Sequence, residues 1–262
     1  MAGPAGAPVV VLLHGWTATA DLNWFTCYSA LGENFRVIAL DHRGHGRGIR
    51  NTHHFSLGDC ADDVAALADR LGIDTFIPVG YSMGGTIAQL MWKRHRDRVE
   101  GLVLAATAGH FVTTNKDRIG FGAMRGIGAL SRLAPPTWRE SASHRLYVSR
   151  KTMTWEPWAA QQLAAHDWSQ ILEAGAALGR YDSRGWLPQV DVPTAVVMTT
   201  DDHVVVPERQ QALVDLIPGA EVRTIAADHD AVFARADDFV PLLVDSCRAV
   251  HRRAVDRDAR SR

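Results

Sequence analysis

Three side chains in this 262-residue chain could together perform nucleophilic catalysis: Ser82, Asp202 and His229. Ser82 lies in "GYSMGG", directly after a short apolar run, while Asp202 and His229 lie just beyond two later runs, in "TTDDHVVVP" and "AADHDAVF". A serine hydroxyl is a weak nucleophile, so it needs an imidazole base and a carboxylate that orients the imidazole. The three residue types therefore predict attack of serine on an acyl carbon.

Glycines surround Ser82 in a pattern typical of a sharp strand-to-helix turn. Gly80 and Gly84 stand at the i−2 and i+2 positions, and Gly85 gives further room where a helix begins. Small neighbours let strand and helix pass closely while the serine points outward. The helix N-terminus then directs the amide of Met83 at the reacting centre. The alternative is a plain or phosphate-binding turn, although "GYSMGG" lacks the G-x-G-x-x-G spacing of a dinucleotide site.

A second backbone donor is predicted after the first apolar run, which ends in "LLHGW". The amide of Trp16 should lie near the same sheet edge as that of Met83. Two such donors from separate loops can form an oxyanion hole, and each is typically worth about 2.7–4 kcal/mol in the transition state.

The identity of the acid is open between two adjacent carboxylates, Asp201 and Asp202. Asp228 and Asp230 flank His229, but carboxylates next to a histidine in sequence usually point elsewhere. We therefore expect the acid to come from the earlier pair, and Asp202 is the preferred member.

Six β-rich runs must position these residues. Most are continuous blocks of Val, Ile, Leu and Ala, which is typical of parallel strands buried on both faces. Helical patterns separate them, with apolar stripes over residues 57–71 and 239–250. The alternation predicts an α/β fold with a doubly wound, mostly parallel sheet, in which sites form at the carboxyl ends of strands. The runs are Val9–His14, Arg36–Asp41, Phe76–Gly80, Gly101–Ala106, Thr194–Thr199 and Glu221–Ala226.

Residues 112–188 contain no convincing strand, and they hold five of the eight tryptophans. A stretch of this length is too long for a plain loop, so we expect a helical cap subdomain inserted into a core of residues 1–111 and 189–262. Trp24, Met124 and Trp155 are the predicted lining of an apolar substrate pocket.

Composition argues against several classes of partner. The formal charge of −1 gives no electrostatic case for nucleic acid or an anionic membrane, and the apolar runs are too short to span a bilayer. The N-terminus lacks signal-peptide character.

Three cysteines without a CxxC predict buried, reduced thiols in a cytoplasmic protein. His42, Arg43 and His45 cluster in a Gly-rich turn, but their spacing fits no compact set of metal ligands.

Taken together, "LLHGW", "DHRGHGRG", "GYSMGG", "TTDDHVVVP" and "DHDAVF" resemble the α/β-hydrolase fold superfamily over roughly residues 9–233. The resemblance implies Ser82 as nucleophile, His229 as base, Asp202 as acid, and the amides of Trp16 and Met83 as oxyanion hole. It also implies a cap over the site. The family commonly begins with an antiparallel hairpin, and only about eight residues precede the first predicted strand here, so we expect either a sheet of six strands rather than eight or an N-terminally short version of the fold.

The predicted activity is carboxylic-ester hydrolysis through an acyl-enzyme, with a small-molecule ester as substrate and with no metal or organic cofactor. Serine in place of aspartate argues against the dehalogenase and epoxide-hydrolase branches. The alternatives are a lactonase, a C–C bond hydrolase or a cofactor-free perhydrolase or haloperoxidase on the same residues, and a slow or non-catalytic receptor of the same fold. The sequence does not determine the physiological substrate or the oligomeric state.

Overall fold

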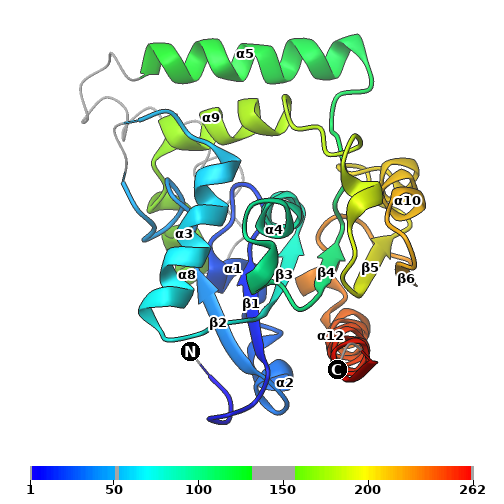
Figure 1. Cartoon of the computed structure of the whole chain (residues 1–262). Coiled ribbons are helices and arrows are strands. Elements are labelled where there is room, and N and C mark those ends of the chain that lie inside the picture. The colour runs from blue at the N-terminus through cyan, green and yellow to red at the C-terminus, as the bar shows by residue number, and fades with distance from the viewer. Residues whose placement is uncertain (1, 51–52, 132–156, 261–262) are drawn as a thin grey trace.

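A computed structural model describes residues 2–50, 53–131 and 157–260, and its centre is a six-stranded sheet (Figure 1). All five pairs of neighbouring strands are parallel, and their order is β2-β1-β3-β4-β5-β6. The predicted fold class is confirmed, and each strand lies within one residue of its predicted bounds. The strands are β1 Val9–Leu13, β2 Arg36–Leu40, β3 Ile77–Tyr81, β4 Leu102–Ala105, β5 Thr194–Thr199 and β6 Glu221–Ile225.

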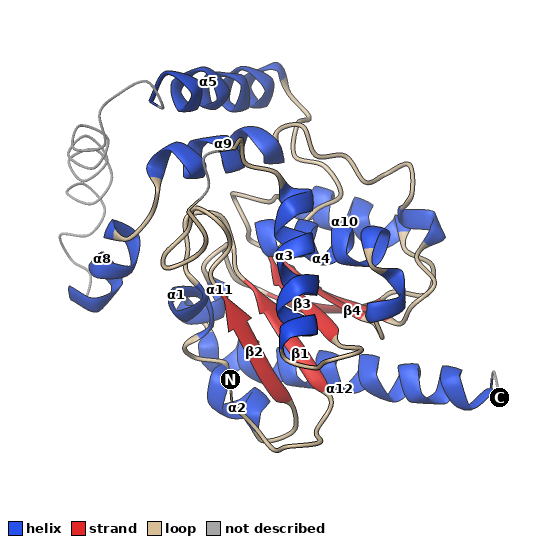
Figure 2. Cartoon of the chain, turned by 60° about the vertical axis from the view of Figure 1, so that its left-hand side comes forward, coloured by secondary structure: helices blue, strands red, loops and turns tan. Residues whose placement is uncertain are grey.

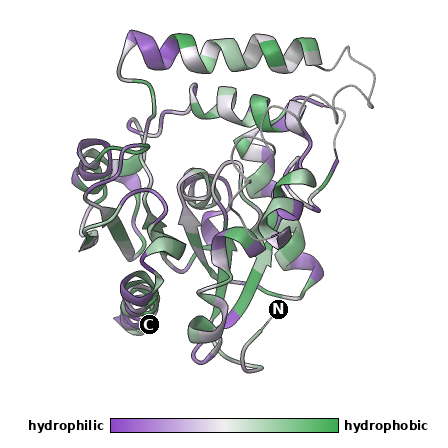
Figure 3. Ribbon diagram, turned by 180° about the vertical axis from the view of Figure 1, so that it is seen from behind, coloured by the Kyte–Doolittle hydropathy of each residue, from purple (hydrophilic) through white to green (hydrophobic). Residues whose placement is uncertain are grey.

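The continuous apolar runs reflect burial on both faces of this sheet. Val11 and Leu13 of β1 belong to one core cluster, whereas Val10 and Leu12 belong to the other, because successive side chains of a strand point to opposite faces. Figure 3 shows the hydrophobic colour along the strands between the helical layers. A strand in this environment needs apolar residues at every position rather than at alternate ones.

Helices cover both faces of the sheet (Figure 2). The first core cluster joins the sheet to α3, α4 and α10, and the second joins it to α1, α2, α11 and α12. Both apolar stripes predicted from the sequence fall on helices. The helices of the core are α1 Ala20–Trp24, α2 Tyr28–Gly32, α3 Leu57–Arg70, α4 Met83–Arg94, α10 Pro207–Leu216, α11 Ala231–Ala234 and α12 Ala236–Arg260, with short 3-10 turns η1 Arg96–Arg98 and η3 Leu187–Gln189.

The strand order reverses at β1, which determines where a site can form. From β1 the chain crosses to β2 on one side and then returns to β3, β4, β5 and β6 on the other. In an open parallel sheet, the loops that follow two such strands diverge to opposite faces, and a crevice is expected between them at the carboxyl ends of the strands. Trp16 follows β1 and Ser82 follows β3, so both residues border this crevice.

The insert, which we define as residues 112–188, holds α5 Asn115–Ser131, α8 Pro157–Ala164 and α9 Trp168–Leu178. Its described residues contain no strand, although His110 and Asp182 form an isolated bridge at its base. Helices α5 and α9 lie side by side beyond the carboxyl ends of the strands (Figure 1). Glycines permit their close approach, since a Cβ on Gly179 would lie 2.3 Å from the Cβ of Phe121. The division into core and cap domains stays a prediction.

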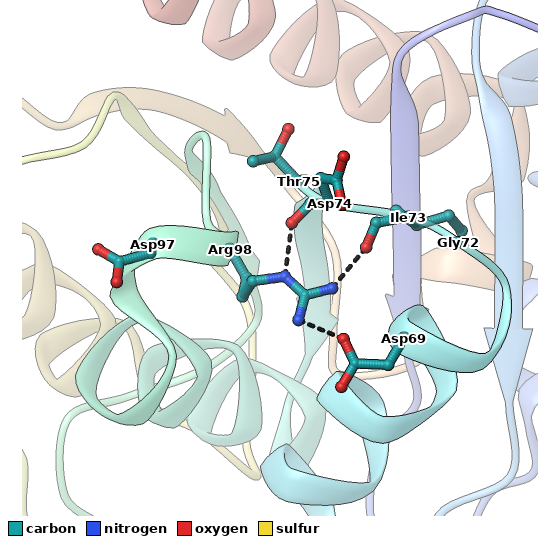
Figure 4. A pocket seen from close by; sticks show the side chains of 7 residues that line it. All are labelled: Asp69, Gly72, Ile73, Asp74, Thr75, Asp97 and Arg98. Atoms are coloured by element: carbon teal, nitrogen blue, oxygen red, sulfur yellow. Dashed lines mark hydrogen bonds and ion pairs between the residues drawn. The ribbon is translucent and has the colours of Figure 1, made fainter.

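A shallow hollow of about 410 Å³ lies at the opposite end of the sheet from the crevice (Figure 4). It borders the residues that precede β3, whereas Ser82 follows the other end of that strand. The guanidinium of Arg98 is held there by Asp69 and by the carbonyl oxygens of Ile73 and Asp74. These contacts tie α3 to the start of β3.

Two further expectations concern the cysteines and membrane-spanning segments. Cys27, Cys60 and Cys247 are buried and free, as predicted. No helix in the described part of the chain is long and apolar enough to cross a membrane.

Candidate active site

Ser82 occupies a strained turn between β3 and α4. Its φ of 53° and ψ of −117° lie in a region that costs a non-glycine residue free energy. Hydrogen bonds from both sides hold it there: its amide donates to the Ala105 carbonyl at 2.9 Å, and its carbonyl accepts from the Thr107 hydroxyl at 2.7 Å. The serine is thus presented at the sheet edge by backbone contacts to β4 and the residues that follow it.

The glycines around Ser82 are required by close backbone contacts. A Cβ on Gly80 would lie 2.2 Å from the Gly84 carbonyl oxygen, and a Cβ on Gly84 would lie 1.9 Å from the Leu13 carbonyl oxygen. On Gly85 it would lie 2.5 Å from the Thr107 side chain. The turn can therefore form only when these three positions lack a side chain.

The structure brings Ser82, His229 and Asp202 into one chain of hydrogen bonds. The Nε2 atom of His229 lies 2.9 Å from the Ser82 hydroxyl oxygen, and its Nδ1 atom lies 2.7 Å from the Asp202 Oδ2 atom. Ser82 is largely buried, with 8% of its surface exposed. The arrangement suits proton transfer from the hydroxyl to a neutral imidazole whose tautomer is set by the carboxylate.

Asp202 is buried and fully partnered. Its Oδ1 atom accepts from the amides of Val204 and Val205 at 2.8 Å each, and its Oδ2 atom also accepts from the Thr199 hydroxyl at 2.7 Å. Burial alone would raise the pKa of this carboxyl, but the hydrogen bond and charge of His229 and the other donors outweigh it and hold the pKa below its usual range.

Asp201 points away from this arrangement. It is exposed, and its carboxylate accepts a hydrogen bond from the neighbouring Thr200 hydroxyl at 3.5 Å. Asp228 accepts from the amides of His203 and His229, and its side-chain partner is the His203 ring at 3.2 Å, whereas the ring of His229 contacts Asp202 and Ser82. Of the carboxylates left open by the sequence, the structure places Asp202 against the base.

Two supporting contacts were missed by the sequence analysis. The Tyr81 hydroxyl donates to the His229 carbonyl at 2.9 Å, and the Gln210 amide contacts both Thr199 and Asp202. No motif signals these roles, because each depends on how loops after different strands meet.

The loop after β1 lies against Ser82. A Cβ on Gly15 would be 3.4 Å from the Ser82 Cβ atom, and the Gly15 amide donates to the Asn23 side chain at 2.9 Å. Among the described residues, the amides of Trp16 and Met83 have no backbone hydrogen-bond partner. Both donors border the crevice at the end of β1 and β3, and both are free to bind an acceptor.

The three predicted pocket residues have different positions. Trp24 has no exposed surface and packs edge-on against Tyr81 in the second core cluster, so it is a core residue in this structure. Met124 on α5 is half-buried and faces α9, where its sulfur would meet a Cβ on Gly175 at 2.6 Å. Trp155 lies outside the described residues.

Four histidines lie buried beside the β1 loop. The ring of His14 lies 4.4 Å from that of His42 and 5.1 Å from that of His45, and His45 lies 5.5 Å from His166 of the insert. Burial lowers the pKa of all four. Across residues 2–50, 53–131 and 157–260, no three metal-ligating side chains are grouped to hold a metal ion.

Comparisons with known proteins agree with this architecture. The sequence model of the family described as alpha/beta hydrolase fold matches residues 8–236. The chain is 32% identical over 224 residues to a protein of Yersinia enterocolitica named a putative carbamate hydrolase, RutD, and the match covers 82% of this chain and 78% of that protein. It is 30% identical over 220 residues to a non-heme chloroperoxidase of Streptomyces lividans, which covers 78% and 77% of the two chains.

A solved structure, that of Est816, an enzyme that degrades N-acyl homoserine lactones, superposes with a TM-score of 0.71. The two chains are 26% identical, and the alignment covers 92% of this chain and 93% of the other.

Proposed function

The chain belongs to the alpha/beta hydrolase fold family, and from this premise we propose that it is a serine hydrolase that cleaves carboxylic esters through an acyl-enzyme. The observation that carries the proposal is the continuous hydrogen-bond chain from the Ser82 hydroxyl through His229 to Asp202. It lies at the point of the sheet where strand order reverses, next to two backbone amides without partners.

In the first step, the Ser82 oxygen attacks the ester carbonyl carbon while His229 Nε2 accepts the hydroxyl proton. Asp202 accepts from Nδ1, so it stabilises the imidazolium that forms and keeps the ring in the useful tautomer. Its depressed pKa keeps the carboxyl ionised, as this role requires. The imidazolium then gives its proton to the leaving alcohol.

Charge develops on the carbonyl oxygen during this attack. The amides of Trp16 and Met83 are the proposed donors, and Met83 is the first residue of α4, where helix N–H groups have no intrahelical acceptor. In the second step His229 activates a water molecule, which hydrolyses the acyl-enzyme and restores the Ser82 hydroxyl. Each amide supports both steps, because both pass through a tetrahedral oxyanion.

The likeness to Est816 favours an ester over other acyl substrates, because the lactones that Est816 degrades are cyclic carboxylic esters. A second candidate is transfer of the acyl group to hydrogen peroxide, which the likeness to a non-heme chloroperoxidase favours. A third is cleavage of a carbamate, named for the bacterial relative. All three use the same attack by Ser82 and differ in the acyl acceptor or the leaving group.

The test is turnover of p-nitrophenyl acetate and p-nitrophenyl butyrate by the full chain and by Ser82→Ala. We expect kcat to fall by about 10³-fold or more in the variant, because the nucleophile is lost while the fold is retained. Ser246→Ala is a matched control, since that buried hydroxyl donates to the Leu242 carbonyl within α12. Near-wild-type turnover by Ser82→Ala would remove Ser82 from the mechanism.

The same preparations distinguish the candidate reactions. Peracid formation from acetate esters and hydrogen peroxide would favour acyl transfer, and release of ammonia from simple carbamates would favour carbamate cleavage. A rate for ester hydrolysis at least tenfold above both would support the principal proposal.

A further inference from the structure

The side chain of Trp16 is bound to the insert rather than to the core. Its indole Nε1–H donates to the Ile171 carbonyl in α9 at 2.8 Å. The ring also lies directly on the α9 backbone, because a Cβ on Gly175 would meet the Trp16 ring at 2.7 Å. The Trp16 side chain is thus held by α9, through a residue that lies 155 positions away in sequence.

The next residue of the loop is held by the same segment. Thr17 has a φ of 63°, and its carbonyl accepts a hydrogen bond from His166 Nε2 at 3.2 Å. The other ring nitrogen of His166 accepts from the Gly46 amide at 2.9 Å, which sets the Nε2–H tautomer. His166 therefore supports a strained backbone conformation that a free loop would tend to leave.

A third contact completes the set. The Thr19 hydroxyl donates to the Gln162 side chain in α8 at 2.9 Å. The insert segment is itself tied to the core elsewhere, since the Asp167 amide donates to the Gly44 carbonyl and the Phe55 amide donates to Glu173. Residues 162–171 thus contact three of the four residues of the loop 16–19, which are Trp16, Thr17 and Thr19.

We propose that residues 162–171 of the insert position the oxyanion-hole donor, with Trp16 and His166 as positioning residues that hold the Trp16 amide in its productive orientation. This inference rests on the proposed function. The core holds the Gly15 amide through Asn23, and it holds the Gly15 carbonyl, which shares a peptide group with the Trp16 amide, through His14. The Ala18 amide also donates to that carbonyl, and the insert then holds the residues between them, through the Trp16 indole and the Thr17 carbonyl. Transition-state stabilisation in the core therefore depends on docking of α9.

The proposal makes a specific kinetic claim. Loosening these contacts changes the direction of one amide, which matters when charge develops on the carbonyl oxygen and little when the substrate binds. Complete loss of an oxyanion donor typically costs about 10²–10³-fold in kcat, and a misdirected donor costs less. We expect Trp16→Phe, which keeps the amide and the ring but removes the indole N–H, to lower kcat by about tenfold with KM within about twofold.

The experiment measures kcat, KM and the inhibition constant of phenylboronic acid, a tetrahedral adduct former, in Trp16→Phe, His166→Ala and His166→Gln. Rates are expressed per site labelled by a fluorophosphonate, so that unfolded protein does not contribute. We expect the inhibition constant to rise with the fall in kcat for Trp16→Phe and His166→Ala. His166→Gln should recover most of both, because its amide can still donate to the Thr17 carbonyl.

Arg209→Lys is the control, since Arg209 anchors the start of α5 through the Phe111 carbonyl and Asp117 without touching the loop 16–19. Unchanged kcat and inhibition constant in Trp16→Phe, or an equal loss in Arg209→Lys, would overturn the proposal. Ser82→Ala run in parallel separates the two claims. If Ser82→Ala is inactive while Trp16→Phe is unaffected, the positioning role fails and the proposed function stands.

Discussion

Mild acid is expected to weaken the fold, because the histidines beside the β1 loop must stay neutral when the chain is folded. His14 Nδ1–H donates to the Gly15 carbonyl, and its Nε2 atom accepts from the His42 amide. His166 is similarly engaged, by Gly46 and Thr17. A second proton on either ring would face an N–H group in a buried site, where an unpaired charge is costly.

The magnitude follows from the pKa values. Burial, partly opposed by the Gly15 hydrogen bond and by Asp41, lowers the pKa of His14 to about 4. Burial also lowers the pKa of His166 to about 4, with the Thr17 hydrogen bond and Asp41 acting in the opposite direction and Arg50 adding to the fall.

These folded-state values lie below the unfolded value of about 6.5, so the unfolded chain binds more protons between pH 4 and 6.5. Stability is therefore complete above pH 6.5 and is lost as the pH falls toward 4. Each histidine costs about 1.8 kcal/mol between pH 7 and pH 5, and the pair costs about 4 kcal/mol. That is a large share of the roughly 5–15 kcal/mol that stabilises a typical domain.

Carboxylates do not contribute to this loss of stability between pH 4 and pH 6.5. Asp117, Asp182 and Asp228 have pKa values lowered to about 2 by hydrogen bonds from backbone amides or from Arg184, so their contribution disappears only as the pH falls below about 4. Burial also lowers the pKa of His42 and His45, which adds to the loss with the same sign.

The assay is urea unfolding followed by circular dichroism at pH 7, 6 and 5, with the wild-type chain and His166→Gln. The variant removes one titrating ring, so the fall in unfolding free energy between pH 7 and pH 5 should shrink by about 1.8 kcal/mol. Equal unfolding free energies at pH 7 and pH 5, or an undiminished fall in His166→Gln, would refute the reasoning.

Three other changes give sharp expectations. Asp202→Asn should lower kcat by about 10²–10⁴-fold, because the imidazole loses its tautomer control and its counter-charge, whereas Asp201→Asn should leave ester turnover within about twofold. Gly84→Ala should cost more than about 3 kcal/mol in thermal melts or abolish expression, since its Cβ would overlap the Leu13 carbonyl; a wild-type melting temperature would contradict this. Gly122→Ala, in the exposed interior of α5 with nothing within 4 Å, should instead raise the unfolding free energy by about 0.5–1 kcal/mol, and a lower melting temperature would contradict it.

Much of the fold could be predicted because its strands are buried on both faces. A run such as "VVVLL" of β1 predicts a strand that is buried on both faces of a parallel sheet. The residues that follow each such run then lie at one edge of the sheet. The meeting of Ser82, Asp202 and His229 follows from that arrangement. The sequence could not decide between Asp201 and Asp202, because the direction of two adjacent side chains depends on the turn that carries them.

Contacts between the insert and the core could not be predicted from the sequence. His166 and His45 are more than a hundred residues apart, and their proximity depends on how α8 and α9 fold back over the loops. Trp24 was expected in the pocket because tryptophan is common there, but α1 is a single short turn, and periodicity over five residues cannot show which face is buried.

The Tyr81 hydroxyl joins the strand that carries the nucleophile to the loop that carries the base. Because Tyr81 directly precedes Ser82 and its hydroxyl donates to the His229 carbonyl, one side chain links the backbone positions of both members of the reacting pair. A directed-evolution library that varies position 81 would therefore act on the spacing between the Ser82 hydroxyl and the His229 imidazole.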